Sequence, residues 1–138
     1  MDHDCEIALV KAFVVPQKRK RYVGFLSSPG RREKFVRELY HFQDFDPACM
    51  VPLSGDNDSD EGLLSELRRR GAGDRCYVIS VSKDLDGVAG PLEEIVKKVF
   101  AFEEGTIISC IPGQLAYYEG EAPKNRFILD ARDGPTMQ

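Results

Sequence analysis

The sequence contains no apolar run long enough to cross a membrane. Of its 138 residues, 42% are hydrophobic and 30% are charged, and its apolar runs stop well short of the roughly 18 residues that a membrane-spanning helix requires. The first ten residues, MDHDCEIALV, also lack the basic start and the small-residue cleavage site of a signal peptide. We therefore expect a soluble, cytoplasmic protein with no membrane partner.

Clustered metal ligands are also missing. No C-x-x-C pair occurs among the cysteines, Cys5, Cys49, Cys76 and Cys110. We therefore expect free cysteines and no zinc site. The acidic stretch DNDSDE has the aspartate spacing of a calcium loop, but Glu61 stands where that loop requires glycine and Leu67 where it requires a bidentate glutamate. We assign no metal ligand and expect this stretch to be a solvated loop before a helix.

The sequence has no recognised catalytic or nucleotide-binding motif. Its glycines do not follow the G-x-G-x-x-G or G-x-x-x-x-G-K order that cradles phosphates between a strand and a helix. The G-x-S-x-G motif of serine hydrolases is absent as well, and His41 is expected on the polar side of a helix. We therefore assign no catalytic residue and no cofactor.

The clearest local signal is a turn at Pro112 and Gly113. Proline presets φ near about −65° at the first central position of a β-turn, and glycine accepts the positive φ that a type II turn needs next. The flanking runs, 107–111 and 114–118, therefore predict an antiparallel hairpin, with splaying or a bulge near Pro112 because type II geometry matches strand twist poorly. Residues 126–130 predict a third strand that completes a meander.

The first part of the chain favours helices but leaves alternatives open. Residues 5–14 suit a helix capped by Asp4, although this stretch is apolar enough on all sides to form a strand. Residues 16–26 suit a second helix that begins with proline. A short strand over 21–26 is the alternative, because Gly24 weakens the helix.

A third helix is expected with Ser28 as its N-cap and Pro29 in its first turn, ending before Phe45. The next segments predict an edge strand over 48–53, a helix over 61–70 and a strand over 76–82. They are followed by a loop over 82–90, a helix over 91–104 that Gly105 ends, and the meander over 107–130.

The expected element order is α-α-α-β-α-β-α-β-β-β, which defines an α+β fold with a helical N-terminal third packed on a sheet. Two crossovers through helices favour parallel neighbours among the first strands, whereas the Pro-Gly turn requires antiparallel pairing at the end. We therefore expect a mixed sheet with a C-terminal antiparallel meander. A single globular domain should span 1–130, and 131–138 should form a flexible tail.

Charge is distributed unevenly along the chain. Residues 1–41 carry nine Lys and Arg against five Asp and Glu, whereas residues 42–138 carry ten against eighteen, so a net charge of −4 divides into +4 and −8. We interpret the basic segment 18–37 as a candidate anion-binding site, because two arginines, two serines and free amides meet at the expected start of the third helix. Its candidate residues are Lys18, Arg19, Lys20, Arg21, Ser28, Arg31 and Arg32.

These observations leave several classes of function open, and the oligomeric state is not predicted. The favoured hypothesis is a non-enzymatic interaction or regulatory domain whose partner is another protein, with Tyr117, Tyr118 and Glu119 of the hairpin as candidate contacts. Adjacent strand residues face opposite sides, so one tyrosine should be available unless helices cover both faces. The alternatives are an anionic partner, including nucleic acid, and a metal-dependent enzyme that uses carboxylates at strand ends, Asp84, Asp86, Glu119, Glu121 and Asp130.

Overall fold

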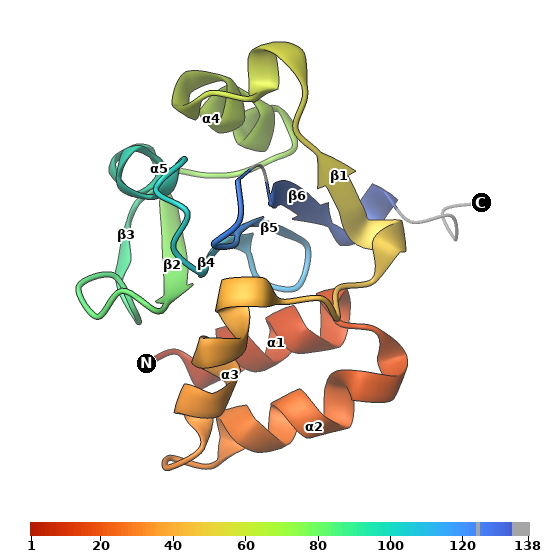
Figure 1. Ribbon diagram of the computed structural model, residues 1–138. Helices are drawn as coiled ribbons and strands as arrows, with labels where there is room; N and C mark the ends of the chain where they lie inside the picture. The colour runs from red at the N-terminus through yellow and green to blue at the C-terminus, as the bar shows by residue number, and fades with distance from the viewer. Residues whose placement is uncertain (124, 134–138) are drawn as a thin grey trace.

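The computed structural model describes residues 1–123 and 125–133, which form three layers (Figure 1). One sheet lies between α1, α2 and α3 on one face and α4 and α5 on the other. The α+β fold is thereby confirmed. The helices are α1 His3–Phe13, α2 Pro16–Ser27, α3 Arg32–Glu38, α4 Asp60–Arg69 and α5 Leu92–Val99. The strands are β1 Met50–Pro52, β2 Arg75–Ser80, β3 Ala89–Pro91, β4 Thr106–Ile111, β5 Leu115–Glu119 and β6 Arg126–Asp130.

The strand order is β1-β6-β5-β4-β2-β3, and every neighbouring pair is antiparallel. The expectation of a mixed sheet is therefore wrong, and the strand β3 was missed inside the expected loop 82–90 and at the expected helix start. The chain reverses into β3 before α5 begins, so α5 joins β3 to β4, which both flank β2. The crossovers do connect strands of the same direction, but these strands are not neighbours.

Both edges of the sheet are formed by short strands. β1 pairs only with β6 and β3 only with β2, and each edge strand has three residues. Each also ends in a proline, Pro52 or Pro91, which has no backbone N–H to donate. The position of β1 confirms the edge strand that Pro52 predicts.

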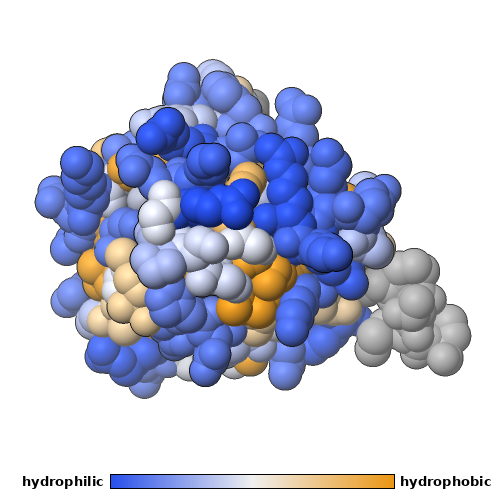
Figure 2. All heavy atoms as spheres, turned by 90° about the horizontal axis from the view of Figure 1, so that it is seen from below, coloured by the Kyte–Doolittle hydropathy of each residue, from blue (hydrophilic) through white to orange (hydrophobic). Residues whose placement is uncertain are grey.

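The sheet is buried on both faces, because side chains alternate along its strands. Tyr77, Ile79, Ile107, Tyr118 and Leu129 join the core beneath α1–α3. Their neighbours belong to the core beneath α4 and α5, in which the central residues are Val78, Ile108, Tyr117 and Ile128. The outer surface of the N-terminal layer is mostly hydrophilic, with small separate apolar areas (Figure 2). None of the helices in the described ranges has the length and apolar character of a membrane span.

The N-terminal segments whose type was left open are helices. Asp2, and not Asp4, caps α1 by accepting a 3.0 Å hydrogen bond from the backbone N–H of Cys5. α2 continues through Gly24 because Tyr22, Phe25 and Leu26 pack into the core on one side. α3 begins at Arg32, later than expected, because the backbone turns after Ser28, whose carbonyl accepts from the N–H of Arg31 at 2.9 Å.

The hairpin formed by β4 and β5 confirms the turn chemistry. Gly113 has a φ of +70°, and the N–H of Gln114 donates to the carbonyl of Ile111 at 2.9 Å. The register shifts between Ser109 and Ile111, as the expected bulge near Pro112 requires. β6 then pairs with β5 and completes the meander.

The expected tail at 131–138 starts with a turn of 3-10 helix, Ala131–Asp133. Arg132 anchors this turn, because its N–H and its guanidinium donate to Asp130. Residues 134–138 lie outside the described residues, so the remainder of the predicted tail is not tested.

Replacing Gly113 with valine should lower the free energy of unfolding by about 1–2 kcal/mol, because a β-branched residue would be held at positive φ. A Cβ at this position meets only ordinary contacts with Ala8, so the strain comes from the backbone alone. Gly73→Val is the matched control, because Gly73 lies outside the strands and a Cβ there meets nothing within 4 Å. Urea denaturation measures both variants, and equal losses would contradict the turn assignment.

Candidate functional site

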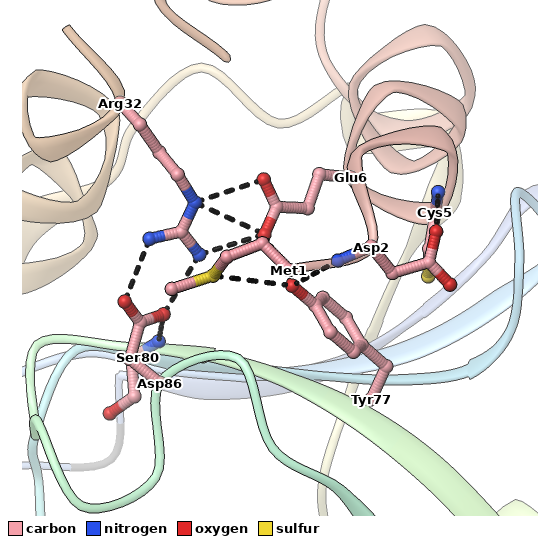
Figure 3. A network of polar contacts seen from close by, with 8 residues as sticks. All are labelled: Met1, Asp2, Cys5, Glu6, Arg32, Tyr77, Ser80 and Asp86. Carbon is pink, nitrogen blue, oxygen red and sulfur yellow. Dashed lines mark hydrogen bonds and ion pairs between the residues drawn. The ribbon is translucent and has the colours of Figure 1, made fainter. Parts of the chain in front are cut away.

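A buried ionic network lies between the N-terminal helices and the end of β2 (Figure 3). Its centre is Arg32, at the start of α3, whose guanidinium reaches Glu6 on α1 and Asp86 in the loop after β2. The closest N–O distances are 2.7 Å to each carboxylate. Glu6 is completely buried, and the Arg32 side chain is only 12% exposed. These three residues, which we call the Arg32 cluster, join three segments far apart in sequence.

Strand β2 supplies further partners to this cluster. The hydroxyl of Tyr77 donates to Glu6 at 2.6 Å and accepts from the backbone N–H of Asp2 at 3.0 Å. The carboxylate of Asp86 also accepts from the backbone N–H of Ser80 at 3.0 Å. Burial, together with the bond to Glu6, raises the pKa of Tyr77, so the phenol stays protonated and remains a donor.

The Arg32 cluster has the properties of a structural unit and not of an open ligand site. The pKa of the Arg32 guanidinium is raised, first by its hydrogen bonds to Asp86 and then by those to Glu6. Burial has the opposite effect on this pKa but is outweighed. Two carboxylates already accept from both terminal nitrogens and from Nε. Arg32 is therefore not available to an external anion, which corrects its place among the candidate anion-binding residues.

Some of the other basic residues gather around one aromatic ring, and the rest are dispersed. Arg21, Arg31 and Lys34 gather around the ring of Phe25, with their charged ends 5.5, 5.2 and 5.8 Å from its centroid. Arg21, Lys34 and Arg37 line a shallow pocket of about 280 Å³, together with Phe25 and Glu38. We call Arg21, Arg31, Lys34 and Arg37, with Phe25 beneath them, the basic surface.

The basic surface carries more positive than negative charge. Arg37 forms a solvent-exposed pair with Glu33 at 3.6 Å. Within the described part of the chain, Arg21, Arg31 and Lys34 form no ion pair. Their position above one aromatic ring gives each a cation–π contact, which leaves the outer side of these groups open to solvent.

The remaining anion-binding candidates do not join this surface as a cradle. Arg19 is half-buried and donates to the carbonyl of Val14 at 2.8 Å. Lys18 is half-buried, Lys20 is exposed, and Ser28 ends α2 without capping α3. Because α3 has seven residues and starts four positions after Ser28, the expected anion cradle at its N-terminus does not form.

The hairpin residues proposed as a partner surface are buried. Tyr117 and Tyr118 have no exposed surface and Glu119 is 1% exposed, because helices cover both faces of the sheet. Tyr118 donates to the carbonyl of Leu39 at 2.7 Å and accepts from the N–H of Phe42 at 3.1 Å. The assignment of these three residues to the surface is thus corrected, and the alternative that both tyrosines are structural holds.

Glu119 has a role that the sequence did not indicate. Its carboxylate accepts from the backbone N–H groups of Ala101 and Glu103 at 2.9 and 2.6 Å, and from the hydroxyl of Tyr117 at 2.6 Å. α5 accordingly ends at Val99, well before Gly105. No local sequence pattern reveals the contacts with Ala101 and Glu103, because these residues follow α5 whereas Glu119 ends β5.

The carboxylates at strand ends do not converge. Glu119 and Asp130 end neighbouring antiparallel strands and lie at opposite ends of the sheet, where Asp130 pairs with Leu115. Arg70 and Arg132 bind Asp130, and Arg32 binds Asp86. Among the described residues, no group of three or more acidic, histidine or cysteine side chains has the arrangement of a metal site.

Comparisons of the chain with protein-family models, with curated proteins and with solved structures found no match. A function for this chain is therefore inferred from the geometry of the molecule.

Arg32→Ala should lower the free energy of unfolding by about 3–5 kcal/mol, because it leaves the buried Glu6 carboxylate without its counter-charge. Arg37→Ala is the matched control, since it removes an arginine from the same helix whose ion pair is exposed, and should change stability by about 0.5 kcal/mol or less. Chemical denaturation measures both. Similar effects of the two substitutions would show that the Arg32 cluster does not stabilise the fold.

The ion pairs of Asp130 predict how the stability of the fold depends on pH. Burial alone would raise the pKa of Asp130, but hydrogen bonds from Arg132 and Arg70 outweigh it and hold this pKa below the usual value of 3.8. A depressed folded-state pKa contributes stability that is present above the unfolded pKa and is lost as pH falls through the folded one. The stability gap between the wild type and Asp130→Asn should therefore narrow from neutral pH to about pH 2, as measured by urea denaturation. A constant gap would contradict this assignment.

Proposed function

We propose that the protein is a non-enzymatic interaction domain that binds a phosphate-bearing polyanion through the basic surface. The observation that supports this proposal is the gathering of Arg21, Arg31 and Lys34 around Phe25 without an ion pair among the described residues. Like charges held this close repel one another, and an anion placed above them relieves that repulsion.

The net charge of −4 does not prevent such contact. At physiological ionic strength the Debye length is about 8 Å, so exposed acidic residues on distant parts of the molecule are largely screened. Arginine also favours phosphate over other anions, because its planar guanidinium donates two parallel hydrogen bonds to the phosphate oxygens. Contacts of this kind read no base sequence, so we expect a single-stranded nucleic acid to bind with little sequence preference.

Binding of a fluorescent single-stranded RNA, measured by anisotropy at several salt concentrations, tests the proposal. Four phosphate contacts correspond to a log–log salt slope of about −3 for a single strand. Arg31→Glu with Lys34→Glu should weaken binding by at least about tenfold and reduce the magnitude of the slope by about 1.4.

The matched control is Arg68→Glu with Lys97→Glu. This pair changes the net charge by the same amount, but it lies on α4 and α5, on the opposite side of the sheet. It should retain wild-type affinity to within about twofold, since charges beyond a Debye length contribute little. Equal weakening by both pairs would mean that total charge, and not the basic surface, controls binding, and no binding at low salt would overturn the proposal.

A further inference from the structure

The loop at residues 101–103 holds an exposed aromatic side chain in a strained backbone. Phe102 is 63% exposed, and the residues on either side of it have positive φ, +68° at Ala101 and +60° at Glu103. Neither residue is glycine, so in each of them the Cβ crowds the neighbouring backbone and the conformation is strained. The loop keeps this shape because the buried carboxylate of Glu119 accepts from both N–H groups.

Burial of apolar surface does not explain this strained loop. Its positive φ angles and its hydrogen bonds to Glu119 hold an apolar ring that faces solvent. Exposed residues with large apolar side chains are few among those described, and Phe102 is the only one of them carried on a loop with positive φ on both sides. Strained segments of this type occur at binding sites, where the strain pre-organises a contact. Phe102 therefore has the character of a protruding anchor.

The surface next to this anchor has acidic character. A shallow pocket of about 410 Å³ is lined by Ser82, Asp84, Leu85, Lys98, Phe102 and Glu104. The two exposed carboxylates, Asp84 and Glu104, exceed the single lysine. A partner for this site should thus combine positive charge with a hollow that accepts an aromatic ring.

The same chain carries a surface with these properties. The basic surface is hollowed by a pocket of about 280 Å³, which is lined by three cations, Arg21, Lys34 and Arg37, by one carboxylate, Glu38, and by Phe25. An aromatic ring that enters it contacts Phe25 and meets the guanidinium groups, which can stack on two rings at once. Asp84 and Glu104 would then face the cations at its rim.

We propose that copies of this protein associate head to tail, with Phe102 of one copy inserted into the basic surface of the next. The contact is heterologous, so each copy retains one unused anchor and one unused pocket, and association continues into longer chains unless the rotation closes a ring. This inference rests on the basic surface of the proposed function. A phosphate-bearing polyanion that occupies the basic surface therefore competes with the second copy.

Sedimentation velocity over a concentration series up to about 1 mM, the weak end of specific affinities, tests this inference. The wild type should form dimers and longer species at low salt and dissociate at about 0.5 M salt, where charge attraction is screened. Phe102→Ala should weaken association by at least about tenfold, as expected for loss of an interface anchor. Because Phe102 is exposed, its loss should leave the melting temperature unchanged.

Mixing two variants distinguishes a head-to-tail contact from a symmetric one. Arg31→Glu with Lys34→Glu reverses two charges of the basic surface but keeps the anchor, whereas Phe102→Ala removes the anchor but keeps the basic surface. Each variant alone should be monomeric, and an equimolar mixture should give a 1:1 dimer and nothing longer. Self-association of the Arg31→Glu, Lys34→Glu protein alone, failure of the mixture to form a dimer, or a monomeric wild type would each overturn the inference.

The RNA measurement separates this inference from the proposed function. Phe102→Ala should bind single-stranded RNA as the wild type does, because the basic surface is intact. Excess RNA should dissociate the wild-type oligomers. Oligomers that persist with RNA bound would place the self-contact elsewhere and overturn the head-to-tail arrangement, even though the proposed function would stand.

Discussion

Enclosing a carboxylate away from water removes its solvation, and Glu6 recovers that loss through the guanidinium of Arg32 and the hydroxyl of Tyr77. Apolar contacts between α1–α3 and the sheet are not directional, whereas the ion pairs and the phenol of Tyr77 have fixed geometry. The Arg32 cluster therefore sets the orientation of the N-terminal layer on the sheet. It also fixes the position of Arg31, whose charge lies beside Phe25 and not in the cluster.

The fold was predictable where its causes are local. The Pro-Gly turn and the amphipathic stripe of α5 identify their elements from a few neighbouring residues. The strand β3 was not predictable, because its three residues have no pattern of their own and pair with a strand earlier in the chain. The antiparallel sheet follows from β3, so missing this strand also produced the wrong sheet type.

Prediction of the candidate site from local sequence was limited in the same way. Arg31 and Arg32 are identical and adjacent in sequence, yet one is exposed and the other is enclosed by two carboxylates. This difference in exposure depends on Glu6 and Asp86, which are far from both arginines in the sequence. Similarly, Tyr117 and Tyr118 face opposite sides as strand alternation requires, but the helices that cover both sides are a property of the whole fold. Local chemistry thus identified which residues carry charge or aromatic surface, whereas tertiary packing decided which of them remain accessible.

The short edge strands limit how this protein can meet another chain. An exposed sheet edge offers a row of unpaired N–H and C=O groups to which a foreign strand can add, and long flat edges lead to aggregation. Here three residues with a terminal proline at either edge, β1 and β3, offer almost no such row. Strand addition is consequently disfavoured on both sides, which leaves side chains on the helices and loops as the groups that another chain would contact, where single substitutions do not disturb the sheet.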